Sequence, residues 1–77
     1  MLKKLSELHV GETGLIKSVQ GEGRIRRRLF DMGVTPNTTV YLRKVAPMGD
    51  PVEITIRGYE LSLRKDEAQY ILVEVGG

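Results

Sequence analysis

The sequence has 77 residues, of which 40% are hydrophobic and 29% are charged, and its formal net charge is +2. A chain this short buries one small core, so we expect one domain over residues 1–77. The lack of cysteine excludes disulfides and thiolate metal sites. No apolar run reaches the roughly 18 residues of a membrane span, and the basic start does not lead into a signal peptide. These features fit a reducing, cytosolic setting.

The first twenty residues predict a helical turn followed by a strand. Residues 5–8 are typical of a short helical turn or irregular cover. Gly11 and Gly14 then turn the chain, and the apolar pattern of residues 15–19 predicts the first strand.

A helix about three turns long follows from Gly23, because the hydrophobic period changes there. Gly33 can adopt the left-handed conformation that ends a helix, Val34 can fold back onto the last turn, and Pro36 prevents the helix from continuing. Three residues at i, i+4 and i+7 define the apolar face: Ile25, Leu29 and Met32.

Two strands are expected over residues 40–45 and 52–57, joined by a loop that turns at Gly49. Apolar and polar residues alternate in the second strand, which predicts a sheet with one wet face. A two-residue connection with Gly58 at its first central position suits a type II′ turn into the next strand, whose Leu61 and Leu63 face inward.

The remaining chain predicts a helical turn over residues 65–71 and a closing strand over residues 72–75. Five short strands, one inserted helix and the late turn indicate a mainly β fold with a small α insertion. The expected architecture is an SH3-like five-stranded β-barrel, which hides the strand edges that otherwise promote aggregation.

Candidate chemistry is sparse. The sequence holds a single histidine, His9, which beside Glu7 or Glu12 could contribute to a weak surface metal site. Tight transition-metal sites need three or four converging ligands, so we expect a solvated histidine and no cofactor. We expect no enzyme, because there is no nucleophile triad, paired-carboxylate pocket or phosphate loop.

The predicted helix carries a cluster of arginines that is a candidate surface for electrostatic docking of a partner. The cluster consists of Arg24, Arg26, Arg27 and Arg28. One of them could act on a γ-phosphate in trans as an arginine finger. The plainer interpretation is a solvated face with modest pairing, such as Arg27 with Asp31 at i, i+4.

Nucleic acid is a weaker hypothesis for the partner. Small barrels bind RNA through aromatic platforms and dense positive stripes, and here aromatics are 5% of the chain while acidic residues interrupt the basic ones. We therefore expect no nucleic-acid binding.

An apolar groove near the helix end is a candidate site for a partner peptide or helix. Phe30 leaves the helix stripe and Met48 lies in a loop, so both are expected to be accessible. Leu29, Met32 and Val34 would complete the groove, although Leu29 and Met32 are also candidate core residues.

Three segments resemble the FeoA family of bacterial ferrous iron transport accessory proteins: RLFDMGVTP at 28–36, APMGDP at 46–51 and RGYELSLR at 57–64. The resemblance extends from about residue 5 to 74. It implies a cytoplasmic SH3-like barrel that associates with FeoB, a membrane transporter with a GTPase domain, and regulates it by protein contact. The chain would then be peripheral to the inner face of the membrane through that partner, and it could form homo-oligomers.

A related barrel also forms the C-terminal domain of iron-dependent repressors of the DtxR type. We expect a free-standing FeoA because no helix-turn-helix precedes the barrel. Asn37 stands where similar sequences often have glycine, and asparagine tolerates a positive φ. The hypotheses in order are an accessory subunit of the iron transporter, a metal-sensing domain with weak divalent binding, and an RNA-binding barrel.

Overall fold

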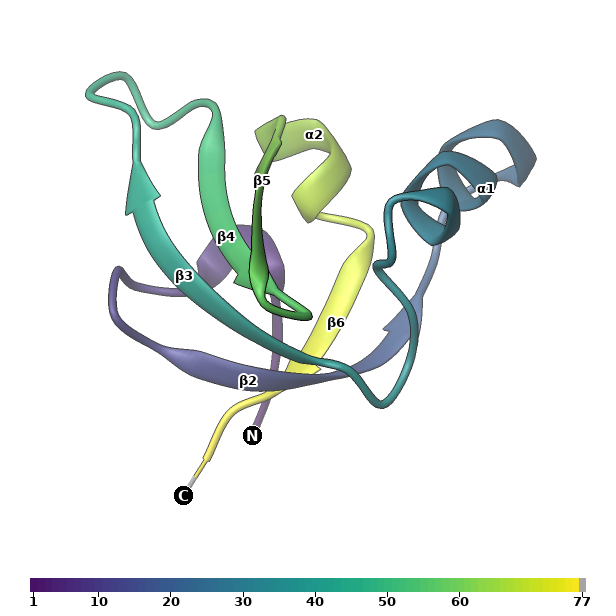
Figure 1. Cartoon of the computed structure of the whole chain (residues 1–77), viewed down its shortest axis with the longest axis horizontal. Helices are drawn as coiled ribbons and strands as arrows, with labels where there is room; N and C mark the ends of the chain where they lie inside the picture. Colours follow the sequence, from purple (N-terminus) through teal and green to yellow (C-terminus); the bar gives the residue numbers. More distant parts are fainter. Residues whose placement is uncertain (77) are drawn as a thin grey trace.

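The computed structural model describes residues 1–76 as one strongly curved antiparallel sheet with helical segments against it (Figure 1). The strands run in the order β1-β6-β2-β3-β4-β5, and within residues 1–76 no ladder joins β5 to β1. The elements in chain order are β1 Leu2–Lys4, η1 Leu5–Glu7, β2 Thr13–Val19, α1 Gly23–Asp31, β3 Thr39–Val45, β4 Val52–Ile56, β5 Tyr59–Leu63, α2 Lys65–Ala68 and β6 Ile71–Glu74.

The predicted mainly β, barrel-like architecture is confirmed, with six strands in place of five. The additional strand is β1, which pairs with β6 through Leu2 opposite Glu74 and Lys4 opposite Leu72. Its sequence, LKK, has no alternation of apolar and polar residues, and Lys3 is half-buried between the exposed Leu2 and Lys4. Pairing with the end of the chain, and not local propensity, makes this segment a strand.

The core lies inside the curve of the sheet and is built by every strand except β1. Ile54 on β4 and Leu29 on α1 are completely buried, which confirms Leu29 as a core residue. Register shifts in β2 near Lys17 and in β3 near Arg43 bend the two strands around this core.

The end of α1 follows the predicted glycine pattern. Gly33 has a φ of +91°, its N–H donates to the Phe30 carbonyl, and the N–H of Val34 donates to the Leu29 carbonyl, each at 2.9 Å. This is a Schellman motif, and Val34 folds back into the core as expected. Asn37 also has the expected positive φ, at +68°.

The turn between β4 and β5 differs from the prediction. Ile56 pairs with Tyr59, so the two central residues are Arg57 and Gly58, and both have positive φ, +51° and +84°. Positive φ at both positions is typical of a type I′ turn and not of type II′. The register is one residue earlier than expected because β4 ends at Ile56.

Other boundaries moved by one to three residues, and the late helix α2 ends at Ala68. β2 begins at Thr13, so Gly14 lies in a strand and not in a turn. Ile71 belongs to β6 and not to the helical turn, because it pairs with Val19. Gly49 has the positive φ expected of a loop turn, at +88°.

We predict that Gly33→Ala destabilises the protein more than Gly58→Ala does. Both glycines have positive φ, so each alanine incurs the left-handed penalty of about 1–2 kcal/mol. A Cβ at Gly58 meets open space, whereas one at Gly33 overlaps the Tyr59 hydroxyl. Urea unfolding should give a total loss of about 2–4 kcal/mol for Gly33→Ala.

The Tyr59→Phe background is the control for that comparison. Removing the hydroxyl should reduce the extra cost of Gly33→Ala toward the cost of Gly58→Ala. Equal losses for the two glycine variants in the wild-type background would contradict the close approach of Tyr59 to Gly33.

Candidate functional site

The net positive charge of the chain is concentrated on α1. This helix of nine residues carries four arginines and one aspartate, whereas the remaining residues include eight basic and nine acidic ones. The helix is thus net +3, and the rest of the chain is close to neutral. A negatively charged partner is therefore attracted mainly to α1.

Two of the four arginines hold the helix to the rest of the fold. Arg28 Nη1 lies 3.2 Å from Glu67 Oε2, which joins α1 to α2. Arg26 Nε donates to the Val19 carbonyl at 3.1 Å, and its guanidinium lies 4.7 Å from the centroid of the Phe30 ring. These contacts give Arg26 and Arg28 structural roles.

The other two arginines, Arg24 and Arg27, are exposed and form no ion pair within residues 1–76. The predicted i, i+4 pair of Arg27 with Asp31 does not form in the described part of the chain. Arg24 and Arg27 are thus the members of the predicted cluster that are available to a partner, whereas Arg28 is already engaged.

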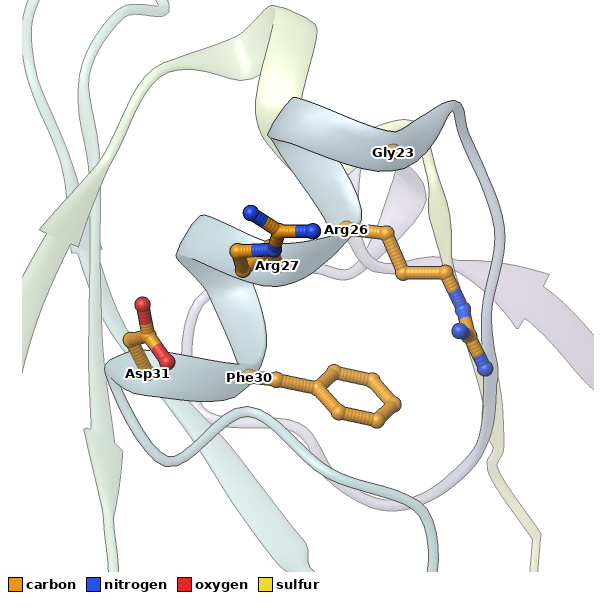
Figure 2. A pocket seen from close by; sticks show the side chains of 5 residues that line it. All are labelled: Gly23, Arg26, Arg27, Phe30 and Asp31. Atoms are coloured by element: carbon orange, nitrogen blue, oxygen red, sulfur yellow. The ribbon is translucent and has the colours of Figure 1, made fainter.

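A hollow of about 410 Å³ opens on the same helix (Figure 2). Phe30 and Arg26 project to one side of α1 in this view, and Arg27 and Asp31 lie on the adjoining face. Phe30 is half-buried against the core. The hollow is therefore bounded by one aromatic side chain and by side chains of both positive and negative charge. Its lining residues are Gly23, Arg26, Arg27, Phe30 and Asp31.

The segment after α1 is held by the β4–β5 turn. Arg57 Nη2 donates to Thr35 Oγ1 at 2.7 Å and to Thr38 Oγ1 at 3.0 Å, and its Nε donates to the Gly33 carbonyl at 3.2 Å. The Tyr59 hydroxyl donates to the Met32 carbonyl. Neither side chain was predicted to support the helix, because no local signal links residues 57–59 to residues 32–38.

The predicted apolar groove is wrong as a single surface. Met48 is 93% exposed in the β3–β4 loop, and this loop and α1 lie at opposite ends of the molecule in Figure 1. Leu29 and Val34 are completely buried, and Met32 is half-buried. Phe30, half-buried on α1, and Met48, exposed in the β3–β4 loop, are therefore two separate features.

His9 lies at the loop before β2, far along the chain from α1. Its side chain is 83% exposed, and Nδ1 is 3.3 Å from Glu12 Oε1. The His9 backbone N–H donates to the same Glu12 oxygen at 2.7 Å. Across residues 1–76, no three His, Cys, Asp or Glu side chains group in a way that could hold a metal ion.

The pKa of the Glu12 carboxyl lies below its ordinary value of 4.5. The main cause is the hydrogen bond from the His9 backbone N–H. Desolvation opposes this effect and raises the pKa, whereas the hydrogen bond and charge of Lys3, whose Nζ lies 3.4 Å from Glu12 Oε1, lower it. The Glu12 carboxylate therefore links Lys3 on β1 to the loop that precedes β2.

None of the helices in the described part of the chain has the length and apolar character needed to cross a membrane.

The family model of the FeoA domain matches residues 3–75 of this chain. The chain belongs to the FeoA family. A curated relative from Porphyromonas gingivalis, the Fe(2+) transport protein A/Fe(2+) transporter FeoB fusion protein, is 40% identical over 72 residues. The match covers 94% of this chain and 8% of the fusion protein. It connects the family directly with ferrous iron transport.

Solved FeoA structures share the fold. The FeoA-like protein from Clostridium acetobutylicum is 42% identical with a TM-score of 0.90, and the match covers 96% of this chain and 86% of that one. Stenotrophomonas maltophilia FeoA, in complex with zinc and described as a prokaryotic SH3 domain protein, is 28% identical with a TM-score of 0.80, over 96% and 89% of the two chains. The SH3-like architecture expected for this FeoA domain is thereby confirmed.

We predict that Arg28→Ala and Arg27→Ala have different effects on stability. Arg28→Ala leaves the Glu67 carboxylate, whose side chain is 11% exposed, with the Arg64 N–H as its remaining donor. This should lower the free energy of unfolding by about 1–2 kcal/mol. Arg27→Ala removes an exposed side chain and should stay within about 0.5 kcal/mol of wild type in urea unfolding. Equal losses would contradict the division of the cluster.

A second prediction concerns pH. The folded-state pKa of Glu12 lies below the unfolded-state value of 4.5, so its ionised carboxylate stabilises the protein above about pH 4.5. This stabilisation is lost as the pH falls through the folded-state pKa. Glu12→Gln should therefore lose less stability than wild type when urea midpoints are compared between about pH 6 and about pH 3. Identical pH profiles would show that the contact with the His9 backbone does not persist in solution.

Proposed function

We propose that this FeoA domain is an accessory protein of ferrous iron uptake that acts by contact with a FeoB-type transporter. The fusion protein carries this proposal, since one polypeptide joins a relative of this chain to FeoB. Covalent linkage keeps two modules at an effective concentration of the order of millimolar, which is useful when they act together. The same contact in this protein would regulate the transporter.

The surface of the chain supports a role in protein contact. The exposed net charge of +3 on α1 and the adjacent hollow form a compact charged and aromatic surface. Met48 offers a separate exposed apolar contact in the β3–β4 loop. A FeoA relative from Stenotrophomonas maltophilia has been suggested to be a bacterial ferrous iron transport activating factor, which agrees with regulation of a transporter.

We place the contact at the cytoplasmic face of the membrane. In this proposal the partner anchors the chain, which itself does not insert. Nucleic acid has no part in the proposal, because half of the arginines on α1 are engaged in contacts within the fold.

The test is affinity purification of the tagged chain from a detergent-solubilised, nuclease-treated lysate, followed by mass spectrometry. We expect the FeoB-type transporter to co-purify, because the proposed contact is direct and does not depend on nucleic acid. A matched sample carrying the tag on an unrelated small domain controls for adsorption. Failure to recover the transporter, with the tagged chain folded, would contradict the proposed function.

A further inference from the structure

The core covers only part of the Phe30 side chain on α1. The apolar stripe of the helix consists of Ile25, Leu29 and Met32, and Phe30 lies beside it. Its ring stays half-buried and forms a wall of the hollow (Figure 2). A large aromatic side chain left partly open between charged residues is a typical anchor point of protein interfaces.

The Arg26 contacts hold this wall in place. The guanidinium is tethered to the Val19 carbonyl and lies over the ring, so neither side chain must be newly ordered when a partner arrives. Preorganised side chains lower the entropic cost of binding. The hollow is therefore a ready-made site, and at about 410 Å³ it lies in the lower part of the 300–1,000 Å³ range of ligand sites.

The charged side chains on α1 determine which kind of partner can bind at the hollow. Arg24 and Arg27 are exposed and have no carboxylate partner within residues 1–76, so both are free to meet negative groups. Asp31 on the same rim would repel a continuous phosphate surface, whether of nucleic acid or of a lipid bilayer. A protein segment with separate carboxylates and an apolar side chain avoids that repulsion and satisfies the arginines.

We propose that the hollow on α1 is the docking site for an acidic segment of the FeoB-type transporter. An apolar side chain of that segment packs on Phe30, and its carboxylates face Arg24 and Arg27. The Met48 loop lies outside this interface. This inference rests on the proposed function and adds the contact surface and the chemistry of the partner segment.

The first experiment measures binding of the full chain to purified, detergent-solubilised FeoB-type transporter of the same organism. Arg24→Glu combined with Arg27→Glu should weaken binding by at least about tenfold, because it places like charge against the acidic segment. Lys4→Glu combined with Lys65→Glu makes the same change in net charge outside α1 and should bind like wild type. Urea unfolding checks that every variant is folded.

A steric variant tests the hollow without changing charge. A Cβ at Gly23 meets nothing within 4 Å, and this residue has no positive φ. Gly23→Trp therefore fits the free protein but occupies the hollow, and it should also weaken binding at least about tenfold. Thr13→Trp, at an exposed position on β2, is the matched control and should leave affinity unchanged.

Photocrosslinking identifies the partner segment. With p-benzoylphenylalanine at position 22, an exposed residue next to Gly23 that does not line the hollow, the crosslinked transporter peptide should carry an excess of Asp and Glu. Reversing those acids to Lys should restore binding to the Arg24→Glu, Arg27→Glu variant. A crosslinked segment without excess acid would overturn the inference.

The outcomes separate the two proposals. If wild type binds the transporter and the α1 variants bind equally well, the docking site is wrong and the proposed function stands. If wild type does not bind, the proposed function fails and the inference fails with it. Tighter binding of wild type to a short RNA duplex or to anionic vesicles than to the transporter would also overturn the inference.

Discussion

The geometry of α1 depends on a meeting of three segments that are distant in sequence. The helix ends in a Schellman motif at Gly33, the following loop presents Thr35 and Thr38, and the β4–β5 turn brings Arg57 onto both. Hydrogen bonds from one guanidinium to a carbonyl and two hydroxyls fix orientation as well as position. Because β4 is buried in the sheet, this arrangement transmits the rigidity of the core to an exposed helix.

That rigidity matters because α1 contributes little to the core. Leu29 is its completely buried residue, while Ile25, Phe30 and Met32 are partly buried. A nine-residue helix is marginal by itself in water, so external contacts must hold it. Arg28 with Glu67, Arg26 with the Val19 carbonyl, and Arg57 beyond the helix end supply these contacts.

The arginine cluster thus serves two purposes. Ion pairing of Arg28 with a largely buried carboxylate and the tether of Arg26 stabilise the position of the helix. Arg24 and Arg27 form no ion pair within residues 1–76 and stay exposed on the same helix, and Arg27 lines the Phe30 hollow. This division of labour supports the proposed docking role, and the fusion of a relative of this chain to FeoB in one polypeptide agrees with it.

Local chemistry in the sequence determined several features of this protein. Gly33 followed by Pro36 predicted the end of α1, because a left-handed residue and a missing N–H act within one turn. The alternation of apolar and polar residues from Val52 to Ile56 predicted a strand with one buried face and one face toward solvent. The three segments that resemble the FeoA family predicted the fold. Each of these signals acts over a few neighbouring residues.

Tertiary structure alone decided the rest. The three residues of β1 form a strand because β6 lies beside them, and Arg28 differs from Arg27 because Glu67 lies opposite it. Phe30 and Met48 fall on opposite sides because the curve of the sheet separates the β3–β4 loop from α1. The physical reason is common to all three: ladder pairing, ion pairing and sheet curvature join residues far apart in sequence, and no local propensity encodes them.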